Sequence, residues 1–171
     1  MPHLNVSNGI IQENNCSLCI NNEDVILFID IEEAFKNLDK AEDGEIRIFA
    51  ERPERVGLKS KEHCDAILIT EKNQETQIKL IELTLKQDRY PCILFNKMNF
   101  CIAFINRILR RAITTFPNSK FKYVTIYVVN PNDVSKLQSF LENLKGSIHN
   151  TYRYIYYISG EIQYQILPCS S

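Results

Sequence analysis

The chain has 171 residues, of which 44% are hydrophobic and 24% charged, a composition typical of a globular protein that can bury its own core. Its formal net charge of −1 excludes a strong overall attraction to nucleic acid, so such binding would need a local basic patch. No apolar run approaches the roughly 20 residues of a membrane span, and residues 1–4 do not open a signal peptide. We therefore expect a cytoplasmic protein without a membrane segment.

Six cysteines in this length raise the question of a metal site or disulfides. Cys16 and Cys19 form a CxxC motif, but no second cysteine or histidine pair follows at zinc-finger spacing. Buried or disulfide-capable thiols are therefore favoured over a metal site. The sequence leaves open whether Cys16 and Cys19 bind metal or form a disulfide.

The first third of the chain has few regular patterns. Residues 1–9 are expected to be a loose start with a turn at Asn8-Gly9, and residues 10–20 form a short strand or an irregular segment. Residues 25–40 begin with a β-branched run that fits a buried strand as well as a helix. Residues 45–50 alternate polar and apolar and predict a half-buried strand, followed by a charged loop over 51–63.

Residues 64–86 predict a hairpin of two apolar strands around a polar turn. If Asn73 and Gln74 are the two turn residues, antiparallel pairing places Asp65 directly opposite Glu82 on the same face. Two opposed carboxylates repel each other, and burial of either one without a partner costs several kcal/mol. A bound divalent cation would remove both penalties, which makes this hairpin the main indication of function.

The second half of the chain has clearer patterns. Apolar residues at helical spacing predict a long helix over about 95–116, and the apolar run at 121–129 predicts a strand. A capped helix follows from Asp133 and is expected to end at Gly146. Residues 152–159 and 161–167 predict two strands of a hairpin or one interrupted strand.

Together these elements predict an α/β (α+β) fold with a central mixed sheet in a three-layer arrangement. We expect one domain over residues 1–171, with its core over about 20–167. The hairpin strands are expected to lie in the middle of the sheet.

This order of elements resembles the α-β-β-β-α-β core of the PD-(D/E)XK nuclease superfamily, the restriction-endonuclease-like fold. The strings around Asp65 (CDAILI) and Glu82 (IELTLK) resemble its motif, an acid at the start of the second core strand and another in the third. The resemblance implies a metal-dependent nuclease, with Asp65 and Glu82 holding Mg²⁺ or Mn²⁺ and the carbonyl of Leu83 as a third ligand. The chain departs from the motif two residues after Glu82, where Thr84 stands in place of a lysine.

The resemblance also implies a lysine and a further acid in the catalytic set. Lys86, one step further along the same strand face, is the expected catalytic lysine, and Glu33 is the expected acid from the first element, ahead of Glu13. If Thr84 instead marks a site without catalysis, the chain would be an inactive nuclease-like subunit that binds nucleic acid or a protein partner.

Two basic groups are expected to contact nucleic acid. The loop before Asp65 and one stripe of the long helix supply them: Arg55, Lys59, Lys61, Arg107, Arg110 and Arg111. Exposure to solvent without any ligand explains the loop group equally well and is the default interpretation of the helical stripe. The tyrosines at 152–157 would permit a homodimer or a protein partner at the sheet edge.

Overall fold

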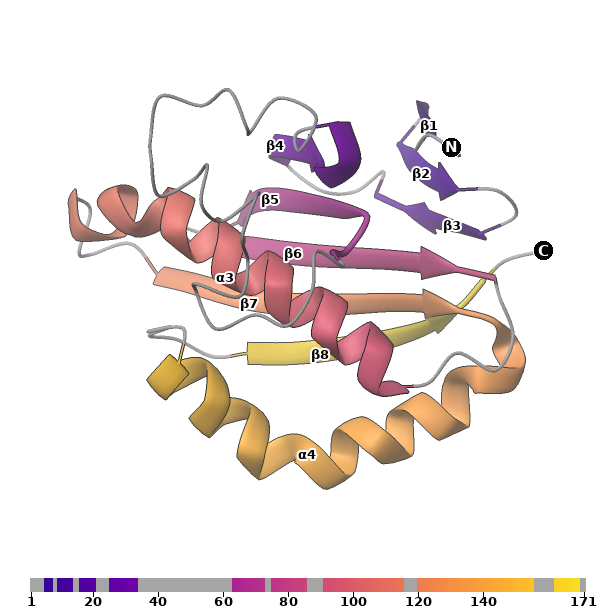
Figure 1. The fold of residues 1–171 in the computed structure, drawn as a ribbon. Coiled ribbons are helices and arrows are strands. Elements are labelled where there is room, and N and C mark those ends of the chain that lie inside the picture. The colour runs from indigo at the N-terminus through magenta and orange to yellow at the C-terminus, as the bar shows by residue number, and fades with distance from the viewer. Residues whose placement is uncertain are drawn as a thin grey trace.

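The structure, a computed structural model, describes residues 5–7, 9–13, 16–20, 25–33, 63–72, 75–85, 91–115, 120–155 and 162–169. These residues form two sheets and two long helices (Figure 1). The predicted strand at 45–50 and the charged loop at 51–62 lie outside the described residues.

A five-stranded mixed sheet forms the centre of the described structure. Its strands lie side by side in chain order: β4 (Val25–Asp30), β5 (Ala66–Lys72), β6 (Glu75–Thr84), β7 (Lys120–Val129) and β8 (Ile162–Pro168). The pairs β4–β5 and β5–β6 are antiparallel, whereas β6–β7 and β7–β8 are parallel. This confirms the expected α/β class with a mixed central sheet and the hairpin strands inside it.

The two parallel pairs are joined by helices, as parallel strands require. Helix α3 (Pro91–Thr115) connects β6 to β7, and a 3-10 turn, η2 (Pro131–Asp133), leads into α4 (Val134–Ile155), which connects β7 to β8. Helices α3 and α4 are drawn in Figure 1. Both contribute to one core on the same face of the sheet, where Leu94, Met98 and Leu137 pack against β5, β6 and β7.

A small antiparallel sheet covers the other face. It consists of β1 (Asn5–Ser7), β2 (Ile10–Glu13) and β3 (Cys16–Cys19) in that order. Its buried side chains Ile11, Cys16 and Leu18 pack against β5, β6 and β7 in a second core. The three expected layers are therefore a helical layer, the central sheet and this small sheet.

The hairpin has the register that the sequence predicts. Lys72 pairs with Glu75 and Ala66 with Ile81, so the same register brings residue 65 opposite residue 82. The turn residues Asn73 and Gln74 lie outside the described residues. Because side chains alternate along a strand, this register fixes which side chains share the helical face.

Two expectations need correction, and one choice that the sequence left open is decided. Residues 5–7 form β1 instead of a loose start, and Gly9 adopts a φ of 72° in the turn that joins β1 to β2. Residues 25–30 form a strand, which decides the open choice between helix and strand. Helix α4 does not end at Gly146 but runs to Ile155, so the strand predicted from 152 is wrong over 152–155. A glycine inside a helix costs only about 1 kcal/mol relative to alanine, and no proline follows it to stop the helix.

Within the described ranges, neither long helix has an apolar stretch of the length and composition that would cross a membrane.

Candidate functional site

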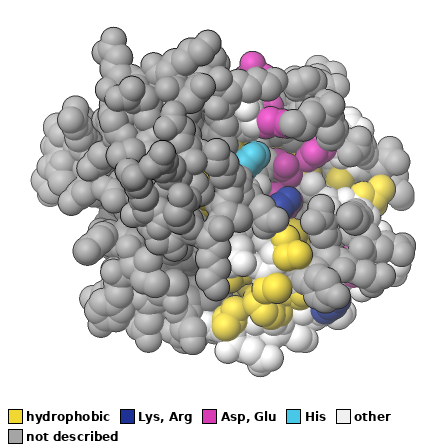
Figure 2. Space-filling model, viewed as in Figure 1, with side chains coloured by type: hydrophobic (Ala, Val, Ile, Leu, Met, Phe, Trp, Pro, Cys, Tyr) yellow, Lys and Arg dark blue, Asp and Glu magenta, His cyan; other side chains and the backbone are white. Residues whose placement is uncertain are grey.

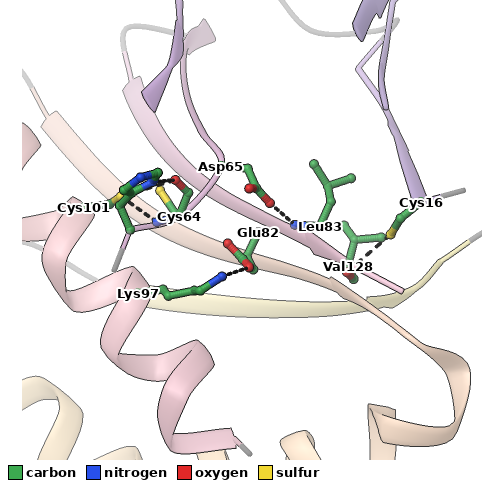
Figure 3. A network of polar contacts seen from close by, with 9 residues as sticks. Cys16, Cys64, Asp65, Glu82, Leu83, Lys97, Cys101 and Val128 are labelled. Carbon is green, nitrogen blue, oxygen red and sulfur yellow. Dashed lines mark hydrogen bonds and ion pairs between the residues drawn. The ribbon is translucent and has the colours of Figure 1, made fainter. Parts of the chain in front are cut away.

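The site lies at the open end of the β5–β6 hairpin, opposite its turn. Asp65 immediately precedes β5, and Glu82 lies near the end of β6. The backbone N–H of Asp65 donates to the carbonyl of Ile81 at 2.9 Å, and the N–H of Leu83 donates to Asp65 Oδ2 at 2.7 Å. β5 begins only at Ala66, whereas β6 continues to Thr84. The Asp65 carboxylate, instead of a backbone carbonyl of β5, therefore accepts the hydrogen bond from the Leu83 N–H. The aspartate is thereby held in position by the backbone of the neighbouring strand (Figure 3).

A lysine that the motif did not predict completes this end of the hairpin. Lys97, in the second turn of α3, forms an ion pair with Glu82, with 2.8 Å between Nζ and Oε1 (Figure 3). The Glu82 side chain is 2% exposed and that of Lys97 18%, so the pair is largely shielded from water. Such shielding strengthens the attraction between the two charges but makes each of them costly to leave unpaired.

A third carboxyl group comes from the small sheet. Glu13, the last residue of β2, lies beside the side chain of Asp65, and a hydrogen bond between the two acids would require a proton on one of them. Within the described residues, no donor reaches the buried atoms Glu13 Oε2 and Glu82 Oε2. The cluster therefore offers two carboxylate oxygens without a hydrogen-bond partner among the described residues.

Burial disfavours the charged form of each acid in this cluster. Burial, followed by the charge of Asp65, raises the pKa of Glu82 to about 8, although Lys97 opposes the shift. Burial and the contact with Asp65 likewise raise the pKa of Glu13 to about 8. Burial also raises the pKa of Asp65, against the lowering effect of the Leu83 N–H. When no cation is bound, protons on these carboxyl groups neutralise the cluster.

Two buried thiols lie directly behind Asp65. The backbone N–H of Cys64 donates to Cys101 Sγ at 3.0 Å, which ties the start of β5 to α3. Burial raises the pKa of the Cys64 thiol well above its usual range, so this thiol stays protonated and unreactive. Next to it, His63 Nδ1 lies 2.9 Å from the carbonyl of Cys64, and a positive His63 favours the charged form of Asp65. These contacts fix the backbone that carries the aspartate.

The ligand types at this site suit a hard divalent cation. In the described part of the chain, no group of three or more histidine, cysteine, aspartate or glutamate side chains has an arrangement that could hold a metal ion. Mg²⁺, however, is commonly held by only one or two carboxylates, with water and substrate phosphates as its other ligands. Asp65 and Glu82 supply such a pair, and the unsatisfied Glu82 Oε2 gives it a binding atom.

The surrounding surface combines acidic and basic side chains. On the face seen in Figure 2, several acidic side chains gather beside a histidine and a basic side chain, with apolar side chains next to them. The charge of Glu32 contributes to the raised pKa of Glu13.

The other residues named from the sequence take different places. Glu33 is exposed on the helical turn after β4, and its backbone N–H donates to Asp30 Oδ1 at 3.2 Å. Lys86 and the loop residues Arg55, Lys59 and Lys61 lie outside the described residues. Arg107, Arg110 and Arg111 belong to the second half of α3, where the backbone alone is described. Of the residues proposed for catalysis, the structure thus brings Asp65 and Glu82 together.

Lys97 is the residue that the sequence reading missed, although a signal was present. It stands three residues after Leu94 and four before Cys101, both buried, so helical spacing places it on the apolar side of α3. A lysine on the buried side of a helix requires a partner. Glu13, named after Glu33 as the additional acid, carried no comparable signal because its strand was too short to predict.

Comparison of the chain with protein-family models, with curated proteins and with solved structures gave no match.

Proposed function

We propose that the protein is a metal-dependent nuclease that hydrolyses phosphodiester bonds of nucleic acid at the Asp65–Glu82 end of the β5–β6 hairpin. The observation that carries the proposal is the ion pair between Lys97 and the buried Glu82, beside Asp65. Two acids and a lysine are the residue types that the resemblance to PD-(D/E)XK nucleases requires. Lys97 supplies the lysine that is missing at position 84.

The order of elements gives further support. The described sequence β4-β5-β6-α3-β7 follows the β-β-β-α-β part of the core of that superfamily, with Asp65 at the start of the second strand and Glu82 in the third. Fold order alone does not establish an activity, so the proposal depends on the chemistry of the site.

Each residue has a role that follows from its position. Asp65 and Glu82 would hold Mg²⁺ or Mn²⁺, which would polarise the scissile phosphate and lower the pKa of an attacking water. The Leu83 N–H orients the Asp65 carboxylate. The ammonium group of Lys97 has three donors, so it can keep its bond to Glu82 and also donate to a phosphate oxygen. Its positive charge would offset the negative charge that develops during hydrolysis.

The experiment is a cleavage assay with the full chain, Mg²⁺ or Mn²⁺, and labelled single- and double-stranded DNA and RNA. We expect Glu82→Gln to reduce cleavage on the order of a thousandfold, since it removes a ligand and a charge partner without changing side-chain size. The matched control is Glu71→Gln, an exposed glutamate on the same hairpin, which is expected to retain cleavage.

Two outcomes would contradict the proposal. Equal cleavage by the wild type and Glu82→Gln would place any nuclease site elsewhere. Binding of nucleic acid by the wild type without cleavage in either metal would favour the inactive nuclease-like subunit instead.

A further inference from the structure

Glu13, which carries the third carboxyl group of the site, is paired across the β2–β3 ladder with a cysteine that forms a disulfide. Cys16 is bonded to Cys169, 153 residues further along the chain. Across the β2–β3 pair, Cys16 is the partner of Glu13. The short hairpin that brings Glu13 to Asp65 is therefore covalently attached to the residue that follows β8.

Cys169 is held in place by contacts with the central sheet. Its backbone N–H donates to the carbonyl of Val129 at 2.7 Å, which fixes it to the end of β7, and its sulphur lies 3.4 Å from the carbonyl of Thr84 at the end of β6. The Cys16 sulphur lies 3.4 Å from the carbonyl of Val128 (Figure 3). The disulfide thus holds β3 against the ends of β6 and β7, close to Glu82.

Without this bond the hairpin has a weak hold on the central sheet. Its two strands are four residues long each, and among the described residues it buries three side chains in the shared core: Ile11, Cys16 and Leu18. A small sheet of this size is marginal by itself. Burial of Glu13 opposes the docking of this hairpin onto the central sheet. Its Oε2 lacks a donor within the described residues, and the neighbouring Asp65 is also acidic.

We propose that the Cys16–Cys169 disulfide is a redox control on the carboxyl cluster. In the oxidised protein the disulfide keeps Glu13 against Asp65 and so raises the affinity of the cluster for a divalent cation. In the reduced protein the β2–β3 hairpin moves away and Glu13 leaves the cluster. The effect on cation affinity rests on the proposed nuclease function, whereas the movement of the hairpin does not.

The chemistry is an ordinary thiol–disulfide exchange. A dithiol gives two electrons and two protons, the Sγ–Sγ bond breaks, Cys16 and Cys169 become thiols, and the dithiol becomes a cyclic disulfide. Both half-cystines are buried, so reduction is expected to be slow. Its completion is measured by a rise from four titratable thiols to six in the unfolded protein.

The test uses the full chain, oxidised or fully reduced and then freed of reductant without exposure to air. Titration calorimetry with Mn²⁺ is expected to give at least about tenfold weaker binding in the reduced protein, the loss typical of removing one supporting carboxylate. Hydrogen exchange is expected to become faster in residues 10–19. The double variant Cys16→Ser, Cys169→Ser should match the reduced protein and no longer respond to reductant. Cys92→Ser, at an exposed free cysteine, is the control.

The variant Glu13→Gln distinguishes redox control of Mn²⁺ binding from a disulfide that only stabilises the fold. In the oxidised form it should bind Mn²⁺ as weakly as the reduced wild type, and reduction should weaken it no further. A disulfide that only stabilises the fold would lower the melting temperature while Mn²⁺ affinity stayed the same, which would overturn the proposal. Unchanged exchange at residues 10–19 after complete reduction would also overturn it. If the oxidised wild type binds no Mn²⁺, the nuclease proposal and the control of cation affinity both fail, and hydrogen exchange alone decides whether the disulfide holds the hairpin.

Discussion

The middle and the open end of the β5–β6 hairpin share one register but have opposite effects on stability. In its middle, the cross-strand pairs Ile67–Leu80 and Ile69–Ile78 face α3 and are apolar and buried. At its open end, the same register brings residue 65 opposite residue 82, and the charge of Asp65 acts on Glu82. The apolar pairs contribute stability through burial, whereas the acidic pair costs stability unless a cation or a proton neutralises it. A protein tolerates such a cost at a site where it serves a function.

The largest effect is expected in the apolar middle of the hairpin. Leu80→Ala removes a fully buried side chain and leaves a cavity, so we expect a loss of about 2–5 kcal/mol of unfolding free energy. Cleavage per folded molecule should be almost unchanged. Urea denaturation followed by circular dichroism measures the first quantity. A stability equal to that of the wild type would show that this face is not the core of the protein.

The next effect concerns the choice of lysine at the acidic end. Lys97→Met removes the charge next to Glu82 and should reduce cleavage roughly a hundredfold, equivalent to about 2.7 kcal/mol in the barrier. Lys86→Met, at the lysine expected from the sequence two residues beyond the motif position, is the competing variant, and Lys136→Met on the exposed side of α4 is the control. A greater loss in Lys86→Met than in Lys97→Met would return the catalytic role to the strand.

The smallest effect is a dependence of cation binding on pH. Burial raises the pKa of Glu82 to about 8, so a cation must displace its proton at lower pH. Mn²⁺ affinity should therefore rise by about tenfold per pH unit for each proton displaced, from about pH 6, and level off above about pH 8. Titration calorimetry across this range measures it, with Glu71→Gln as the control. Affinity that does not vary with pH would mean that Glu82 is not a ligand.

The same pKa shift has the opposite consequence for the protein without a cation. The pKa of Glu82 is higher in the folded state than its ordinary value of 4.5, so the folded state binds more protons than the unfolded state between these values. The contribution of Glu82 to stability is therefore present below about pH 4.5 and is lost as the pH rises towards about 8.

The amino-acid sequence by itself determined the local features around the site. Two apolar runs within residues 64–86 and a polar turn with Asn73 and Gln74 as its two central residues were enough to predict the register that pairs residue 65 with residue 82, because the length of the turn sets the register of a hairpin. Helical spacing likewise predicted most of α3, and a β-branched apolar run predicted β7.

Only the tertiary structure decided which distant residues join that pair. Lys97 reaches Glu82 because the crossover from β6 to β7 places α3 over the hairpin, and Glu13 reaches Asp65 because the small sheet covers the opposite face. The partner of Cys16 is Cys169 instead of Cys19, a pairing that sequence spacing does not encode. Strand and helix periods are properties of neighbouring residues, whereas these contacts depend on how complete layers pack together.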